Sequence, residues 1–170
     1  FIDDAIKRGA VAVVTDNRPF SAKRTMSIPV IQTDNPRRAM AKAAARFWPQ
    51  QPGLIGAVTG TNGKTSTVDF MRQIWARMNW PSISIGTIGM SGDSMNRPTT
   101  PMADIAQLTT PDSLNLHASI ATVAEQGVTH LALEASSHGL QQHRLDGLNI
   151  HVAGFTNLSR DHLDHHRNMD

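Results

Sequence analysis

The chain has 170 residues, with 16 Lys and Arg against 14 Asp and Glu for a formal net charge of +2, and no cysteine. This length suffices for one full domain or for parts of two, and the lack of cysteine excludes disulfides and thiolate metal sites. Scattered basic residues and few aromatic ones argue against a nucleic-acid partner, and no run of about eighteen apolar residues exists that could insert into a membrane.

The first fifty residues predict short alternating elements. We expect a helix over residues 2–8, strands over residues 10–14 and 28–32, and a helix over residues 36–48, since its proline suits the first helical position. The apolar face expected for this last helix contains Ala39, Met40, Ala43, Ala44 and Phe47. Residues 49–53, with two prolines and a glycine, break these patterns and predict a linker, so we expect a domain boundary there.

Strand and helix patterns alternate after the linker. Strands are expected over residues 54–58, 82–88, 129–133 and 151–155, and helices after residue 63 and over residues 113–126. A polar loop with Gly92, Asn96 and Pro98 follows the second of these strands. The helix after residue 63 has a stripe expected to face the core, made of Val68, Met71, Ile74, Trp75 and Met78. The alternation predicts an α/β fold, a parallel sheet covered by helices on both faces, in which ligands bind at the carboxyl ends of the strands.

The segment Thr-Gly-Thr-Asn-Gly-Lys-Thr-Ser follows the strand over residues 54–58 and opens the next helix. A glycine turn in this position aims backbone N–H groups and the helix dipole at an anion, while Lys64 adds a mobile charge and Thr65 can bind magnesium. Val58 stands where the usual pattern has its first glycine, so the loop is a shortened variant, and an ordinary turn is the alternative. The predicted ATP site consists of Thr59, Gly60, Thr61, Asn62, Gly63, Lys64, Thr65 and Ser66.

Two further polar clusters follow expected strands. Glu134 ends one strand, and Asn157 follows another and leads into Ser-Arg-Asp-His-Leu-Asp-His-His over residues 159–166. Both clusters should lie beside the phosphate loop, where Glu134 would complete the magnesium site that Thr65 begins. We expect His162 to bind a second magnesium ion, and His165 and His166 to be solvated or to face the substrate. The same histidines could instead form the zinc site of a hydrolase.

Four ordered segments make the chain resemble a known family. TGTNGKTST, LTTPDS, LEASSHGLQQHRLDGL and FTNLSRDHLDHH are similar to segments of the Mur ligases of peptidoglycan synthesis, most closely the MurE type, which adds the third peptide residue to UDP-MurNAc-L-Ala-D-Glu. The likeness covers nearly all of residues 53–170, and the initial FIDDAIKRGAVAVV resembles the end of the family's UDP-binding domain. The resemblance implies that residues 1–50 end that domain and that residues 51–170 form a truncated P-loop central domain that binds ATP.

The resemblance also implies a reaction. ATP phosphorylates the terminal carboxylate of the nucleotide-bound dipeptide, and the amine of meso-diaminopimelate or L-lysine then displaces phosphate from the acyl phosphate. The implied catalytic residues are Lys64, Glu134 and His162, and the implied magnesium ligands are Thr65, Glu134 and His162. Asn157 joins the loop residues at the ATP. The implied sugar-nucleotide site consists of Thr109, Thr110, Ser136, Gln142 and Arg144, whose guanidinium suits a phosphate or carboxylate. We further expect a monomer in the bacterial cytoplasm.

Two departures from the family pattern matter. Family members usually carry a carbamylated Lys shortly after the DHLD segment and a carboxy-terminal domain that recognises the amino acid, and neither falls within these residues. We therefore expect a piece of a longer protein that is inactive alone, an expectation that also fits the start at Phe1 without methionine. The sequence Asp-Asn-Pro-Arg at residues 34–37 spells a diaminopimelate-recognition motif, but it precedes the phosphate loop, so we interpret it as a helix start.

Three other functions stay open. One is a ligase like folylpolyglutamate synthetase, although that loop typically reads GKGS where this chain has Gly-Lys-Thr-Ser at residues 63–66. Another is a nucleotide-binding module without ligase activity, in which the nucleotide switches a partner. The third is a metal-dependent hydrolase built on the histidine cluster.

Overall fold

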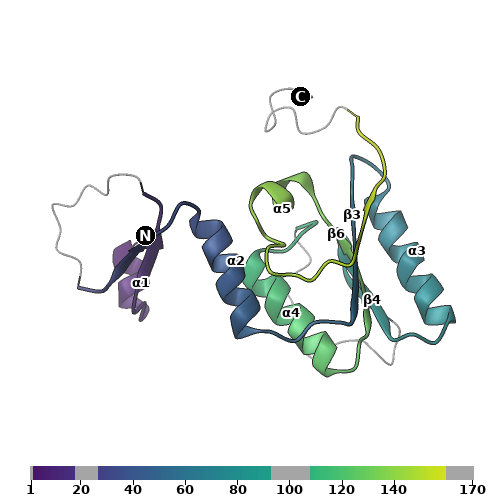
Figure 1. Cartoon of the computed structure of the whole chain (residues 1–170), viewed down its shortest axis with the longest axis horizontal. Coiled ribbons are helices and arrows are strands. Elements are labelled where there is room, and N and C mark those ends of the chain that lie inside the picture. Colours follow the sequence, from purple (N-terminus) through teal and green to yellow (C-terminus); the bar gives the residue numbers. More distant parts are fainter. Residues whose placement is uncertain (1, 18–26, 93–107, 160–170) are drawn as a thin grey trace.

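The computed structural model describes residues 2–17, 27–92 and 108–159. Figure 1 shows a central sheet with helices on both sides and, beside it, a small unit formed by the first helix and the first two strands. The predicted α/β fold is confirmed. Within the described part of the chain, no helix has the length and apolar character needed to cross a bilayer.

The small unit contains α1 (Ile2–Lys7) and two parallel strands, β1 (Val13–Thr15) and β2 (Val30–Gln32). Both strands begin two or three residues later than predicted. Pro29 explains part of the difference: its carbonyl accepts a hydrogen bond from Val13 (2.9 Å), but proline has no N–H to donate, so the paired ladder begins at Val30.

The helix α2 (Pro36–Phe47) begins where its proline predicts, and the side chain of Asn35 caps it by accepting from the Arg38 N–H at 3.0 Å. Its predicted apolar face is only partly right, because Phe47 is 77% exposed, and Ala41 and Ala44 are the buried residues. These small side chains let α2 pack closely on α4. The loop at Gly147 also lies against α2, because a Cβ added to Gly147 would lie only 2.5 Å from the Ala45 Cβ.

An ion pair and a hydrogen bond also join the two halves of the chain. Arg38 Nε lies 3.0 Å from Asp146 Oδ2, and Gln51 of the expected linker donates to the Gly147 carbonyl at 3.0 Å. The helix α2 therefore packs on the second half of the chain. The domain boundary at residues 49–53 stays a prediction.

The central sheet has the strand order β5-β4-β6-β3-β7. Its strands are β3 (Leu54–Thr59), β4 (Ser82–Gly86), β5 (Gly89–Gly92), β6 (His130–Glu134) and β7 (Val152–Phe155). All neighbours are parallel except β4 and β5. The strand predicted over residues 82–88 instead ends at Gly86 and turns back, with Gly89 at φ +83°, into β5, which lies where we predicted a loop.

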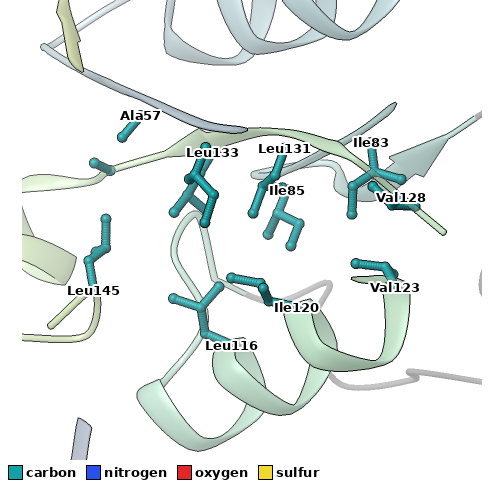
Figure 2. Close-up of a cluster of buried hydrophobic side chains, with 12 residues drawn as sticks. Ala57, Ile83, Ile85, Leu116, Ile120, Val123, Val128, Leu131, Leu133 and Leu145 are labelled. Atoms are coloured by element: carbon teal, nitrogen blue, oxygen red, sulfur yellow. The ribbon is translucent and has the colours of Figure 1, made fainter. Parts of the chain in front are cut away.

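One face of the sheet holds the main hydrophobic core. Figure 2 shows Leu116, Ile120 and Val123 pointing from α4 (Ser113–Glu125) toward the sheet. They meet the strand residues Ile83, Ile85, Leu131 and Leu133, all fully buried. Burying each such side chain contributes about 1.5–3 kcal/mol. Asp112 caps this helix by accepting from the N–H groups of Leu114 and Asn115, which fixes where it begins.

The opposite face is covered by α3 (Lys64–Arg77). Val68 is buried there with Val58 and Ala132, and Met71 and Trp75 pack against them. Gly56 makes the close approach possible, because a Cβ on it would meet Met71 Cε at 2.6 Å. Ile74 and Met78 were predicted as core but are 58% and 49% exposed, since the contact with the sheet uses a narrower stripe of the helix.

Candidate active site

The carboxyl ends of the parallel strands meet at one edge of the sheet. Val58 pairs with Glu134, Thr59 pairs with Phe155, and Ile85 pairs with Leu133. The segments that follow β3, β4, β6 and β7 therefore leave the sheet side by side. The two strand-end polar clusters expected beside the phosphate loop are Glu134 and Asn157, and both lie at this edge.

The phosphate loop depends on two glycines with positive φ, Gly60 (+127°) and Gly63 (+85°). A Cβ on Gly60 would collide with the Thr156 hydroxyl and would lie 2.9 Å from the Asn157 carbonyl. Only glycine fits here, because both the conformation and the space exclude a side chain.

The segment after β7 fastens the loop. Thr61 N–H donates to the Asn157 carbonyl at 2.9 Å, and Asn62 N–H donates to Asn157 Oδ1 at 3.1 Å. Thr156 donates from its hydroxyl to the Asn62 carbonyl at 2.6 Å. The side chain of Asn157, which was predicted to bind ATP, thus bonds the backbone of Asn62 and supports the loop.

The amino terminus of α3 is left without a capping side chain. Side chains of Asn35, Asp112 and Ser136 cap α2, α4 and α5 (Ser137–Gln141), whereas Gly63 precedes α3. The first backbone hydrogen bond of α3 comes from Thr67 to Gly63 at 3.0 Å, and within the described residues no partner accepts from the N–H groups of Lys64, Thr65 and Ser66. Such N–H groups, together with the helix dipole, form an anion-binding site.

The Lys64 ammonium lies over the loop. It donates to the carbonyls of Gly60 at 2.6 Å and Thr61 at 2.9 Å. Its positive charge therefore lies on the loop that leads into α3. A mobile charge and free N–H groups on one loop are the features expected of a phosphate site, and the assignment of this loop to a phosphate stays a prediction.

Glu134 is fully buried at the end of β6. Its Oε1 accepts from the Thr87 N–H at 2.9 Å and its Oε2 from the Thr87 hydroxyl at 3.2 Å. Ala132, two residues earlier in β6, packs against α3. Because residues two apart in a strand point to the same face of the sheet, the Glu134 side chain lies on the face that α3 covers. None of the ion pairs among residues 2–17, 27–92 and 108–159 includes this carboxylate.

These donors fit a magnesium ion. A buried carboxylate without a cationic side chain beside it is a hard oxygen ligand, and the Thr65 hydroxyl belongs to the first turn of α3. No group of three or more His, Asp or Glu that could hold a metal exists among the described residues. Glu134 and Thr65 would supply the one or two protein ligands that magnesium usually takes, with water and phosphate oxygens completing its shell.

The residues predicted to bind the sugar nucleotide form one network. Thr110 donates to the Glu134 carbonyl at 2.8 Å and accepts from the N–H and hydroxyl of Ser136 at 2.9 and 3.0 Å. Arg144 donates to the Thr110 carbonyl and, from Nε and Nη2, to Gln142 Oε1 at 3.2 and 2.8 Å. Thr110 is fully buried and these three bonds saturate its hydroxyl, so the hydroxyl supports its neighbours in this structure. The ligand-binding role predicted for Thr110 stays a prediction.

Two functional candidates escaped the sequence analysis. Thr87 holds Glu134 and shares a hydrogen bond of 3.1 Å with the Thr109 hydroxyl, and Thr156 holds the loop. Both follow a strand directly, the same signal that selected Glu134. Thr87 was missed because the strand was expected to run to residue 88. The predicted ligand His162, with His165 and His166, lies outside the described residues.

Comparisons with known proteins find one family model and many relatives that match this chain. Residues 58–170 match the family model of the Mur ligase middle domain. The UDP-N-acetylmuramoyl-L-alanyl-D-glutamate–2,6-diaminopimelate ligase of Bradyrhizobium diazoefficiens is 53% identical over 167 residues, which are 98% of this chain and 32% of that protein. The ligase of the same name from Brucella melitensis is 48% identical over 170 residues, 100% of this chain and 33% of the relative. The chain thus spans about a third of the length of these relatives.

Solved structures give the same result. A structure of a UDP-N-acetylmuramoyl-L-alanyl-D-glutamate–2,6-diaminopimelate ligase superposes with a TM-score of 0.75 at 32% identity, covering 96% of this chain and 31% of the other. The MurF ligase from Thermotoga maritima in complex with ADP matches with a TM-score of 0.51 at 20% identity, covering 99% and 34%. The second likeness concerns the fold alone.

Proposed function

Because the chain belongs to the Mur ligase family, we propose that it forms the nucleotide-binding part of an ATP-dependent ligase that adds 2,6-diaminopimelate to UDP-MurNAc-L-Ala-D-Glu. The names of the relatives support this choice of amino acid. The observation that carries the nucleotide assignment is the uncapped start of α3 behind a glycine loop, one strand away from the buried carboxylate of Glu134.

In this proposal the loop binds the phosphates of ATP. The free N–H groups of Lys64, Thr65 and Ser66 donate to phosphate oxygens, and the Lys64 ammonium exchanges its bonds to the loop carbonyls for bonds to the transferring phosphoryl group. Preorganised charge of this kind stabilises negative charge as it develops during phosphoryl transfer.

Glu134 and Thr65 would hold magnesium. When bound, the ion neutralises phosphate charge and orients the nucleotide. The protein prepares for it by burying Glu134 and fixing both carboxylate oxygens on Thr87, so the ligand needs no rearrangement. A role for His162 at a second ion rests on the family resemblance.

On the other side of Glu134, the residues Thr109, Ser136, Gln142 and Arg144 would bind the sugar nucleotide and direct its terminal carboxylate toward ATP. Arg144, fixed on Gln142 and Thr110, offers a rigid positive charge near that edge. The carboxylate oxygen attacks the γ-phosphorus, ADP leaves, and the incoming amine displaces phosphate from the acyl phosphate to form the amide.

The proposed ligase function extends to the domains of the chain, its oligomeric state and its location. Residues 1–50 contribute the end of a UDP-binding domain, residues 51–170 contribute part of the central ATP-binding domain, and the enzyme works as a monomer in the cytoplasm. The separation of α1, β1 and β2 from the central sheet supports the first of these, although α2 packs on α4.

Calorimetric titration of the whole enzyme with Mg-ATP and with UDP-MurNAc-L-Ala-D-Glu tests the proposal. The ligase requires a site for both ligands and releases phosphate only when dipeptide and amino acid are present. UDP-MurNAc-L-Ala, which lacks the glutamate carboxylate, serves as the matched control and should release none. Binding of nucleotide alone would indicate a switch module, and binding of neither ligand would favour the hydrolase.

A further inference from the structure

Thr87 joins two parts of the site that the sequence motifs treat separately. It lies in the turn between β4 and β5, outside the four motif segments that first indicated the family resemblance. Its N–H and hydroxyl bind the two oxygens of Glu134, and its hydroxyl also meets the hydroxyl of Thr109 at 3.1 Å. A single residue therefore touches both the proposed metal ligand and the proposed sugar-nucleotide site.

The turn is shaped around the Glu134 carboxylate. A Cβ on Gly86 would collide with Glu134 Oε1 and lie 2.6 Å from its Cγ, so the missing side chain of Gly86 creates the space that the carboxylate fills. Thr87 then supplies the donors on the wall of that space. Because Glu134 is fully buried and in no ion pair among the described residues, these two bonds determine how its oxygens are oriented.

The donors and acceptors among Thr109, Thr87 and Glu134 can be assigned because a hydroxyl group has a single proton to donate. A Glu134 that binds a metal is ionised and only accepts, so the single hydroxyl proton of Thr87 points to Oε2. In the bond between Thr87 and Thr109, Thr87 must then be the acceptor and Thr109 the donor. The hydroxyl of Thr109 has only lone pairs left to offer a ligand.

We propose that Thr87 is a positioning residue that orients Glu134 for magnesium and makes Thr109 an obligatory acceptor, which selects an N–H or O–H group of the sugar nucleotide at that point. The inference rests on the proposed function. Thr109 is the one to meet the ligand because Thr110 is fully buried with its hydroxyl saturated by Glu134 and Ser136.

The test compares Thr87→Val, Thr87→Ser and Thr122→Val in the whole enzyme. Valine keeps the shape of threonine without the hydroxyl, serine keeps the hydroxyl, and Thr122 loses a comparable bond, 2.9 Å to the Ala118 carbonyl, within α4 and away from the site. The affinity for Mn²⁺ is measured by electron paramagnetic resonance in the presence of a non-hydrolysable ATP analogue, and KM for the sugar nucleotide is measured separately from kcat.

We expect Thr87→Val to weaken Mn²⁺ binding by about 10-fold or more, as loss of a partner of a metal ligand generally does, and to raise KM for the sugar nucleotide by roughly 2- to 10-fold. Thr87→Ser should restore both values to within about twofold of the wild type, and Thr122→Val should change neither. If Thr87→Val does not fold, Thr87→Ala repeats the measurement.

Wild-type values for both Mn²⁺ and the sugar nucleotide in Thr87→Val would overturn the inference. A serine variant as defective as the valine variant would also overturn it, because the hydroxyl would then not be the group that matters. Failure of the wild-type enzyme to bind either Mg-ATP or the sugar nucleotide would instead count against the proposed function.

Discussion

The side chain of Asn157 and the backbone of Asn62 form a reciprocal pair: Asn62 N–H donates to Asn157 Oδ1 at 3.1 Å, and Asn157 Nδ2 donates back to the Asn62 carbonyl at 3.1 Å. The two residues are 95 positions apart in the chain. The conformation of the phosphate loop therefore depends on the strand β7, which brings Asn157 to it, and not on the loop sequence alone.

Replacing Asn157 should weaken ATP binding without removing any proposed phosphate ligand. Asn157→Ala loses two hydrogen bonds, each contributing about 0.5–1.5 kcal/mol, so we expect ATP affinity to fall roughly 5- to 150-fold. Asn115→Ala is the matched control, because among the described residues that exposed side-chain amide bonds only Asp112, the cap of α4, at 2.6 Å. Calorimetry with Mg-ATP measures both. An unchanged affinity in Asn157→Ala would mean that the loop holds its shape unaided.

Gly60→Ala should abolish nucleotide binding. Alanine at φ +127° costs about 1–3 kcal/mol in backbone strain, and its Cβ collides with Thr156, so the loop must move away from β7. Gly127→Ala separates the two effects, since Gly127 also has positive φ (+88°) but nothing within 4 Å of the added Cβ. It should lower the melting temperature and keep ATP binding. Equal ATP affinities in the two variants would contradict a steric role for Thr156.

Lys64→Ala should stop the reaction while sparing the sugar nucleotide. Removing a preorganised charge at the transferring phosphoryl group lowers kcat by about 100- to 1,000-fold. Binding of UDP-MurNAc-L-Ala-D-Glu should stay at the wild-type level, because in the described part of the chain Lys64 bonds the carbonyls of Gly60 and Thr61 and none of the residues proposed for the sugar nucleotide. The exposed Lys42 of α2 provides the control, Lys42→Ala. Full amide formation by Lys64→Ala would refute the role assigned to this lysine.

Sequence patterns predicted the elements whose ends carry local signals. Pro36 and the glycine loop predicted the starts of α2 and α3, and the alternation of strands and helices predicted the parallel sheet and the edge at which Glu134 and Asn157 lie. These features depend on residues that are close together in the chain, so they can be predicted from a single sequence.

Features that depend on packing between distant segments were not predictable. Periodicity assigned Ile74, Met78 and Phe47 to the core, but which stripe of a helix is buried is decided by how close the neighbouring element can come, here through Gly56 and the small residues of α2. The partners of Glu134 escaped for a similar reason. Thr87 reaches the carboxylate only because β4 stops at Gly86 and turns back.

His117 should make stability fall in mild acid. Its ring is buried on α4, Nε2 lies 3.1 Å from the Asp146 carbonyl, and Nδ1 has no partner among the described residues. A carbonyl only accepts, so Nε2 carries the proton and Nδ1 is the site that acid would protonate. Burial lowers the pKa of His117 below its ordinary value near 6.5, although the bond to Asp146 works in the opposite direction.

The direction of this change in stability follows from which state of the chain binds the proton more readily. Below about pH 6.5, His117 binds a proton in the unfolded chain but stays neutral in the folded protein. The free energy of unfolding therefore decreases as the pH falls, by at most about 1.4 kcal/mol per pH unit. His117→Gln should flatten the dependence of melting temperature on pH between about 5 and 6.5, the range below this ordinary value. His130→Gln is the comparison, since burial lowers the pKa of His130 too but its ring bonds Thr129 and is less buried. If His117→Gln keeps the full wild-type slope, another group, and not the unpartnered Nδ1, opposes protonation in the folded state.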